Sequence, residues 1–146
     1  MAEYCEYYSV CHYLPLRSET KVYQRRKVTV EKPMFPGYVF ADVPGPKRDL
    51  VIRSSSLARM IEVTDQGRFL GEIEQVRKAL DIDPTLGATA AITSGKPVRI
   101  TGGPFQGLEG VVATVHGVTR VVLNVDMIGQ AVKLDVEMGL LEPLSD

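Results

Sequence analysis

Residues 32–40 read Lys32-Pro33-Met34-Phe35-Pro36-Gly37-Tyr38-Val39-Phe40. The Pro36-Gly37 pair predicts a bend at the entry to a strand, and apolar side chains surround it. In the strand that follows, Tyr38 and Phe40 share one face and Val39 takes the other. Two interpretations stay open. Either these rings fill a hydrophobic core, or Phe35, Tyr38 or Phe40 forms an exposed apolar pocket of the kind that marks a protein partner.

A second glycine-rich run follows at residues 98–112, Val98-Arg99-Ile100-Thr101-Gly102-Gly103-Pro104-Phe105-Gln106-Gly107-Leu108-Glu109-Gly110-Val111-Val112. Glycine tolerates positive φ, so the chain can turn sharply between two strands while Phe105 folds back over a core. The turn chemistry falls on Gly102, Gly103, Pro104, Gly107 and Gly110. This pattern is informative about the fold and says little about function by itself.

Hydrophobic periodicity divides the chain into an α+β part at residues 1–80, a linker at 81–95 and an all-β part at 96–146. Tyr4, Tyr8 and Cys11 predict a helix over 3–13, and Ile73, Val76 and Leu80 predict another over 72–80. The other predicted elements are a hairpin at 21–31 with the charged tip Gln24-Arg25-Arg26-Lys27, a helix at 47–57, and strands at 38–43, 60–63, 98–101, 110–115, 120–125, 131–136 and 140–141. Short strands separated by glycine turns favour a small closed barrel at the C-terminal end.

The bulk composition is that of a globular protein, with 45% hydrophobic and 24% charged residues in a 146-residue chain of net charge −1. No apolar stretch is long enough to span a bilayer, and Cys5 and Cys11 are too few for a disulfide framework. We therefore expect a cytoplasmic protein with no membrane partner.

Charge is unevenly distributed along the chain. Residues 17–32 contain six basic and two acidic side chains, whereas residues 96–146 contain four basic and six acidic ones. The basic segment is either a solvated hairpin or a surface that contacts DNA, RNA or an acidic protein face.

The sequence contains few residues that could form a catalytic site. Neither His12 nor His116 has an obvious nucleophile partner, and Cys5, Cys11 and His12 lack the fourth ligand of a typical zinc site. We expect a non-enzyme with no cofactor and no bound metal.

In this order and spacing, the two runs resemble the bacterial NusG family of transcription elongation factors, over roughly residues 10–143. The first resembles the signature of the NGN domain and the second the KOW motif. The resemblance implies an NGN-type antiparallel sheet with flanking helices, followed by an SH3-like KOW barrel. It also implies that Phe35, Pro36, Gly37, Tyr38 and Phe40 dock onto the clamp helices of RNA polymerase. A second polymerase contact would involve Arg48, Asp49, Arg53 and Ser54.

In this family the KOW domain recruits a second partner, either termination factor Rho or a small-subunit ribosomal protein, through an exposed strand edge. The apolar end of the strand around Asn124–Ile128 suggests that Met127 and Ile128 form this surface, flanked by Phe105.

The chain departs from the family at its start, because only a dozen residues precede the matching segment Tyr13-Leu14-Pro15-Leu16 and the chain contains no tryptophan. By this resemblance the usual first strand is missing, which implies either a misassigned start site or a shortened paralogue. The short N-terminal domain resembles the specialised RfaH-like paralogues more than the housekeeping factor. The spacing of Tyr4, Tyr8 and Cys11 favours a helix rather than a strand over residues 3–12. The alternative function is an RNA-binding KOW module associated with the ribosome or with RNA. That alternative predicts a basic barrel, and the acidic balance of residues 96–146 counts against it.

Overall fold

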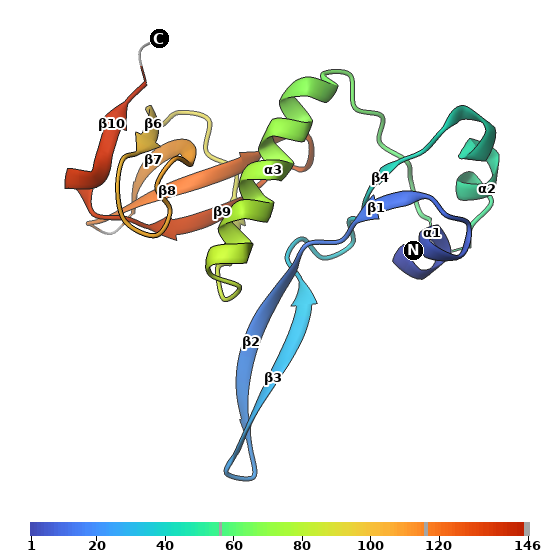
Figure 1. Cartoon of the computed structure of the whole chain (residues 1–146), viewed down its shortest axis with the longest axis horizontal. Coiled ribbons are helices and arrows are strands. Elements are labelled where there is room, and N and C mark those ends of the chain that lie inside the picture. The colour runs from blue at the N-terminus through green and yellow to red at the C-terminus, as the bar shows by residue number, and fades with distance from the viewer. Residues whose placement is uncertain (56, 116, 145–146) are drawn as a thin grey trace.

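The computed structural model describes residues 1–55, 57–115 and 117–144. Figure 1 shows a large sheet with one long helix lying across it, two short helices on the opposite side of the molecule, and an arm that projects between these two parts. The large sheet has six strands and the arm has two. All the sheets are antiparallel, which confirms the predicted α+β class.

The N-terminal end contains α1 (Ala2–Tyr7), β1 (Cys11–Tyr13), β4 (Phe40–Asp42), the 3-10 turn η1 (Gly45–Lys47) and α2 (Arg48–Ile52). The predicted helix over 3–13 is therefore too long. It ends at Tyr7, because Ser9 takes a positive φ of 56° that an α-helix cannot contain. Residues 11–13 instead form a strand that pairs with β4 in a two-stranded sheet.

A small second core holds this end together. Cys5, Val10 and Val51 are buried in it, whereas Cys11 is exposed rather than lying on the inner face of a helix. The Lys47 ammonium joins the two helices by donating to the carbonyls of Tyr8 and Ser9 at 3.0 and 3.2 Å. The predicted helix over 47–57 shortens to the five residues of α2, and the strand predicted at 60–63 does not form.

The arm consists of β2 (Leu16–Tyr23) and β3 (Arg26–Pro33), paired in continuous register from Leu16–Pro33 to Tyr23–Arg26. This confirms the predicted hairpin and extends it at both ends. Gln24 and Arg25 connect the strands with φ values of 45° and 67°. Two positive φ values in a two-residue loop are the signature of a type I′ turn, whose twist matches that of the paired strands.

Helix α3 (Gln66–Ile82) covers one face of the large sheet and packs on β8. It begins after Asp65, whose side chain accepts a hydrogen bond from the Arg68 amide at 3.2 Å. Val76, Ala79 and Leu80 form its buried face. The predicted helix over 72–80 is confirmed, and it starts six residues earlier than its apolar pattern indicated.

The large sheet has the strand order β10-β6-β7-β8-β9-β5. Its members are β5 (Gly87–Ala90), β6 (Pro97–Ile100), β7 (Glu109–Val115), β8 (Val118–Val125), β9 (Gln130–Asp135) and β10 (Leu141–Pro143), with 3-10 turns η2 (Asp126–Ile128) and η3 (Met138–Leu140) between the last strands. The C-terminal strand predictions are confirmed in order and position. The closed barrel is not found among the described residues. β5 occupies the edge of β9 where β10 would have to pair to close a ring, so the sheet remains open.

The segment predicted as a linker thus contributes a strand to the large sheet. Moreover, the main core is shared by residues far apart in sequence, with Phe35 and Phe40 in the same cluster as Val76 of α3 and Val121 and Leu134 of the sheet. The helix assigned to the first sequence unit therefore packs on strands of the second.

Candidate functional site

The Pro36-Gly37 bend is a well-defined turn at the base of the arm. The Tyr38 amide donates to the Phe35 carbonyl at 3.1 Å, and Gly37 has a φ of 87°. Proline at the second position and a glycine with positive φ at the third are the signature of a type II turn. Pro36 and Gly37 are exposed, and Tyr38 is half-buried against the main core.

The two phenylalanines of the same motif belong to the core. Phe35 is 1% exposed and Phe40 is 9% exposed. Their ring centroids lie 6.2 Å apart in an edge-on arrangement, and Phe40 makes a similar contact with Phe69 of α3 at 5.4 Å. Neither ring is available to an exposed pocket, so the accessible part of the expected docking residues is Pro36, Gly37 and Tyr38.

The residues expected to make a second polymerase contact lie on and just after α2. Figure 1 places this helix at the end of the molecule opposite the six-stranded sheet. Arg48, Asp49 and Arg53 are exposed, and Arg48 forms an ion pair with Glu62. Ser54 is buried at 7% exposure, so its side chain does not contribute to the outer surface.

The glycine-rich run at 102–110 forms the turn between β6 and β7. Gly103 and Gly107 have φ values of 79° and 94°, as predicted for turn glycines. The Gly107 amide donates to the Ile100 carbonyl at 2.8 Å and closes the loop, while Phe105 turns inward beside Leu108. Gly110 has another role, because a Cβ there would lie 2.6 Å from both Val121 Cγ1 and the Val122 carbonyl oxygen.

The expected second-partner surface is smaller than the sequence suggested. Met127 is 37% exposed, but Ile128 is half-buried against the main core and Phe105 is 9% exposed. The segment is also η2 rather than the end of a strand, because β8 ends at Val125. Of the three residues, Met127 alone presents a large exposed side chain.

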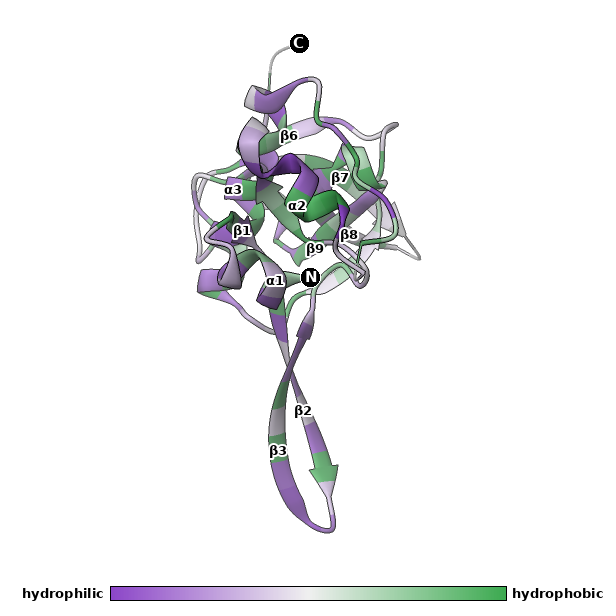
Figure 2. Ribbon diagram, turned by 90° about the vertical axis from the view of Figure 1, so that its right-hand side faces the viewer, coloured by the Kyte–Doolittle hydropathy of each residue, from purple (hydrophilic) through white to green (hydrophobic). Residues whose placement is uncertain are grey.

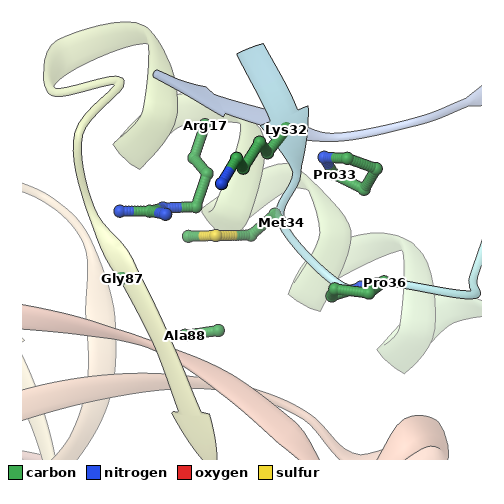
Figure 3. A pocket seen from close by; sticks show the side chains of 7 residues that line it. All are labelled: Arg17, Lys32, Pro33, Met34, Pro36, Gly87 and Ala88. Carbon is green, nitrogen blue, oxygen red and sulfur yellow. The ribbon is translucent and has the colours of Figure 1, made fainter. Parts of the chain in front are cut away.

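A cavity of about 500 Å³ opens at the base of the arm, where β3 passes the start of β5. Figure 3 shows the side chains of Arg17 and Lys32 extending toward it from the two strands of the arm. The rest of the lining is Pro33, Met34, Pro36, Gly87 and Ala88. Arg17 also bridges the arm to the sheet, since its Nε donates to the Leu86 carbonyl at 3.1 Å.

Sequence reasoning missed this cavity. The residues Gly87-Ala88-Thr89-Ala90 that line and flank it are small and show no periodicity, so nothing in the sequence marked them as a strand. Their pairing with β9 brings the segment beside the arm.

Metal-ligating side chains do not gather anywhere in the described residues as a group of three or more. Cys5 is buried, and burial raises the pKa of its thiol, whereas Cys11 is exposed on β1. The His12 Nδ1 lies 3.1 Å from the Val10 carbonyl. His116 falls outside the described residues.

Within the described ranges, none of the helices has the length and hydropathy needed to cross a bilayer. A scan against protein-family models gave no match to this chain, and neither did a search of curated proteins.

Proposed function

We propose that this chain is a NusG-like transcription factor that binds RNA polymerase and regulates elongation, termination or antitermination. The observation that supports it best is the exposed type II turn at Pro36-Gly37, located at the first of the two motifs that resemble the family. Phe35 and Phe40 are buried on either side of the turn, so the chain presents Pro36, Gly37 and the Tyr38 ring from a fixed base. A rigid turn loses little conformational entropy on binding.

The proposal extends to the fold. Under it, β1, β4 and the arm correspond to the NGN-type sheet, and β6 to β10 correspond to the KOW unit. The last strand β10 returns to pair with β6, the first strand of that unit, while the sheet stays open between β10 and β9. In this chain, strand β5 extends the unit at its other edge.

Two further contacts follow from the same proposal. The exposed side chains of Arg48, Asp49 and Arg53 would meet the polymerase at a second point. Met127 would contribute to the surface for a second partner, either Rho or a small-subunit ribosomal protein.

Binding of the full-length chain to bacterial core RNA polymerase tests the proposal. We expect Tyr38→Ala to weaken binding by about thirtyfold, the effect of losing an interface hot spot worth about 2 kcal/mol. Pro36→Glu is a second variant that places a charge on the turn while its side chain remains outside the core. The matched control is Tyr7→Ala, which removes an 82% exposed tyrosine from α1 and should leave binding unchanged. Undiminished polymerase binding by folded Tyr38→Ala and Pro36→Glu variants would contradict the proposal.

A further inference from the structure

The arm projects from the body of the molecule and makes few contacts with it beyond its base (Figure 1). Every residue from Thr20 to Thr29 is exposed. At about 3.3 Å per residue, each eight-residue strand spans roughly 26 Å. An exposed ribbon of this length buries little surface and therefore adds little to the stability of the core. A contribution to core stability thus does not account for the length of the arm.

The register of the arm sorts its side chains onto two faces, because directly paired residues of an antiparallel ribbon point to the same side. One face, called the basic face below, carries Arg17, Glu19, Lys21, Tyr23, Arg26, Val28, Val30 and Lys32. The opposite face carries Leu16, Ser18, Thr20, Val22, Lys27, Thr29, Glu31 and Pro33.

Charge is strongly asymmetric between these faces. The basic face has four cations and one carboxylate, whereas the opposite face has one of each. Figure 2 shows hydrophilic residues along both strands of the arm, but it is the register that separates them by charge. The positive charge of this segment is therefore concentrated on one face of the arm.

The basic face holds a single carboxylate among its four cations. Glu19 pairs with Lys32 at 2.8 Å and lies 4.0 Å from Arg17, and the hydrogen bond from Lys32 lowers the pKa of the Glu19 carboxyl. The nearby Lys32 ammonium in turn lowers the pKa of Lys21. Like charges held this close favour an anion between them.

The basic face continues into the cavity at the base of the arm. Arg17 and Lys32 are its innermost pair, and both extend toward that cavity in Figure 3. Among the described residues, the lining of this cavity contains no carboxylate. Positive charge thus runs from Arg26 near the tip to the junction with the sheet.

We propose that the basic face of the arm binds the sugar-phosphate backbone of duplex DNA. Arg17 and Lys21 lie four strand residues apart, roughly 13 Å, so one small anion cannot contact both, whereas a chain of phosphates can. Proteins that bind single strands stack successive bases on aromatic side chains, and this face offers Tyr23 as its one aromatic ring. A two-stranded ribbon also fits the major groove of a duplex. Contacts of this kind are independent of base sequence and sensitive to salt.

Fluorescence anisotropy with the full chain and a duplex of arbitrary sequence, without polymerase, tests this inference separately from the proposed function. Lys21→Ala should weaken binding about threefold to tenfold and reduce the slope of log affinity against log salt by about 0.9. Lys21→Ala together with Arg26→Ala should weaken binding by more than about tenfold.

The matched control is Lys27→Ala, which removes the same charge from an equally exposed position on the opposite face and should leave affinity and salt slope nearly unchanged. Circular dichroism of each variant checks that the fold is retained. Equal losses from Lys21→Ala and Lys27→Ala would overturn the assignment to one face. Absence of duplex binding at 50 mM salt would overturn the proposal, as would tighter binding to single-stranded RNA that depends on the Tyr23 ring.

Discussion

At the scale of single residues, one motif combines side chains with different tasks. Phe35 and Phe40 anchor the Pro36-Gly37 turn in the core, while the turn itself stays exposed. The glycine-rich motif shows the same division. Gly103 and Gly107 supply positive φ, and Gly110 supplies room for the neighbouring strand. Glycines within one motif are therefore required for different physical reasons, positive φ at some positions and close packing at another.

Gly110→Ala tests the packing role of this glycine. We expect it to lower the free energy of unfolding by about 1–3 kcal/mol, because the new methyl group meets the Val121 side chain and the Val122 backbone at 2.6 Å. Gly139→Ala is the control, since a Cβ at that position meets nothing within 4 Å and its φ is not positive. The control should change stability by less than about 0.5 kcal/mol in urea unfolding. Equal stability of both variants would show that close packing at Gly110 does not require a glycine.

At the scale of elements, α3 connects the two ends of the molecule. Its buried face packs on the sheet, and its Phe69 contacts Phe40. The polar side of its first turns faces η2, where Arg68 pairs with Asp126 and the Glu72 carboxylate accepts a hydrogen bond from the Asp126 amide at 3.4 Å. This contact places two carboxylates close together.

The proximity of Glu72 to Asp126 makes the stability of the fold depend on pH, and Glu72→Gln should remove this dependence. Burial, followed by the Asp126 charge, raises the pKa of Glu72 above its ordinary value. The folded state then holds the Glu72 proton more tightly than the unfolded chain does, so this group's contribution to stability declines as pH rises from the ordinary carboxyl pKa through the raised one. We expect Glu72→Gln to raise the melting temperature at pH 7 relative to the parent, and the difference to vanish well below pH 4. A lower melting temperature at pH 7 would show that the ionised carboxylate is stabilising.

At the scale of the whole molecule, the main core joins segments that the sequence assigned to separate units. Phe35 and Phe40 come from the N-terminal third, and Val121 and Leu134 come from the last strands of the large sheet. We infer that most of the chain unfolds as one unit, because neither segment can bury its apolar face without the other.

Phe40→Ala tests this coupling. Loss of the buried ring should lower the free energy of unfolding by about 3–5 kcal/mol and reduce hydrogen-exchange protection in β8 as well as in β1. Tyr7→Ala, which removes an exposed ring, should leave both regions protected. Two separate unfolding transitions, with protection in β8 unaffected by Phe40→Ala, would show that the ends fold independently.

Local patterns in the sequence were enough to place the hairpin, the core of α3, and β6 to β10. Each depends on alternation, helical spacing or turn residues close in sequence. The bend at Pro36-Gly37 was also predictable, since proline fixes φ near the value that the second turn position needs and glycine permits the positive φ of the third. The ends of the two short helices were harder to predict, because α1 ends at Tyr7 without a nearby proline or glycine to mark that end.

Tertiary structure alone decided which rings of the motif are buried, that β5 joins the sheet and keeps it open, and which face of the arm carries the charge. Burial of Phe35 and Phe40 depends on α3 and the sheet closing over them. The small residues of β5 have no pattern of their own and become a strand by pairing with β9. The charged face arises from the cross-strand register of β2 and β3, which pairs residues up to seventeen positions apart and cannot be derived from composition.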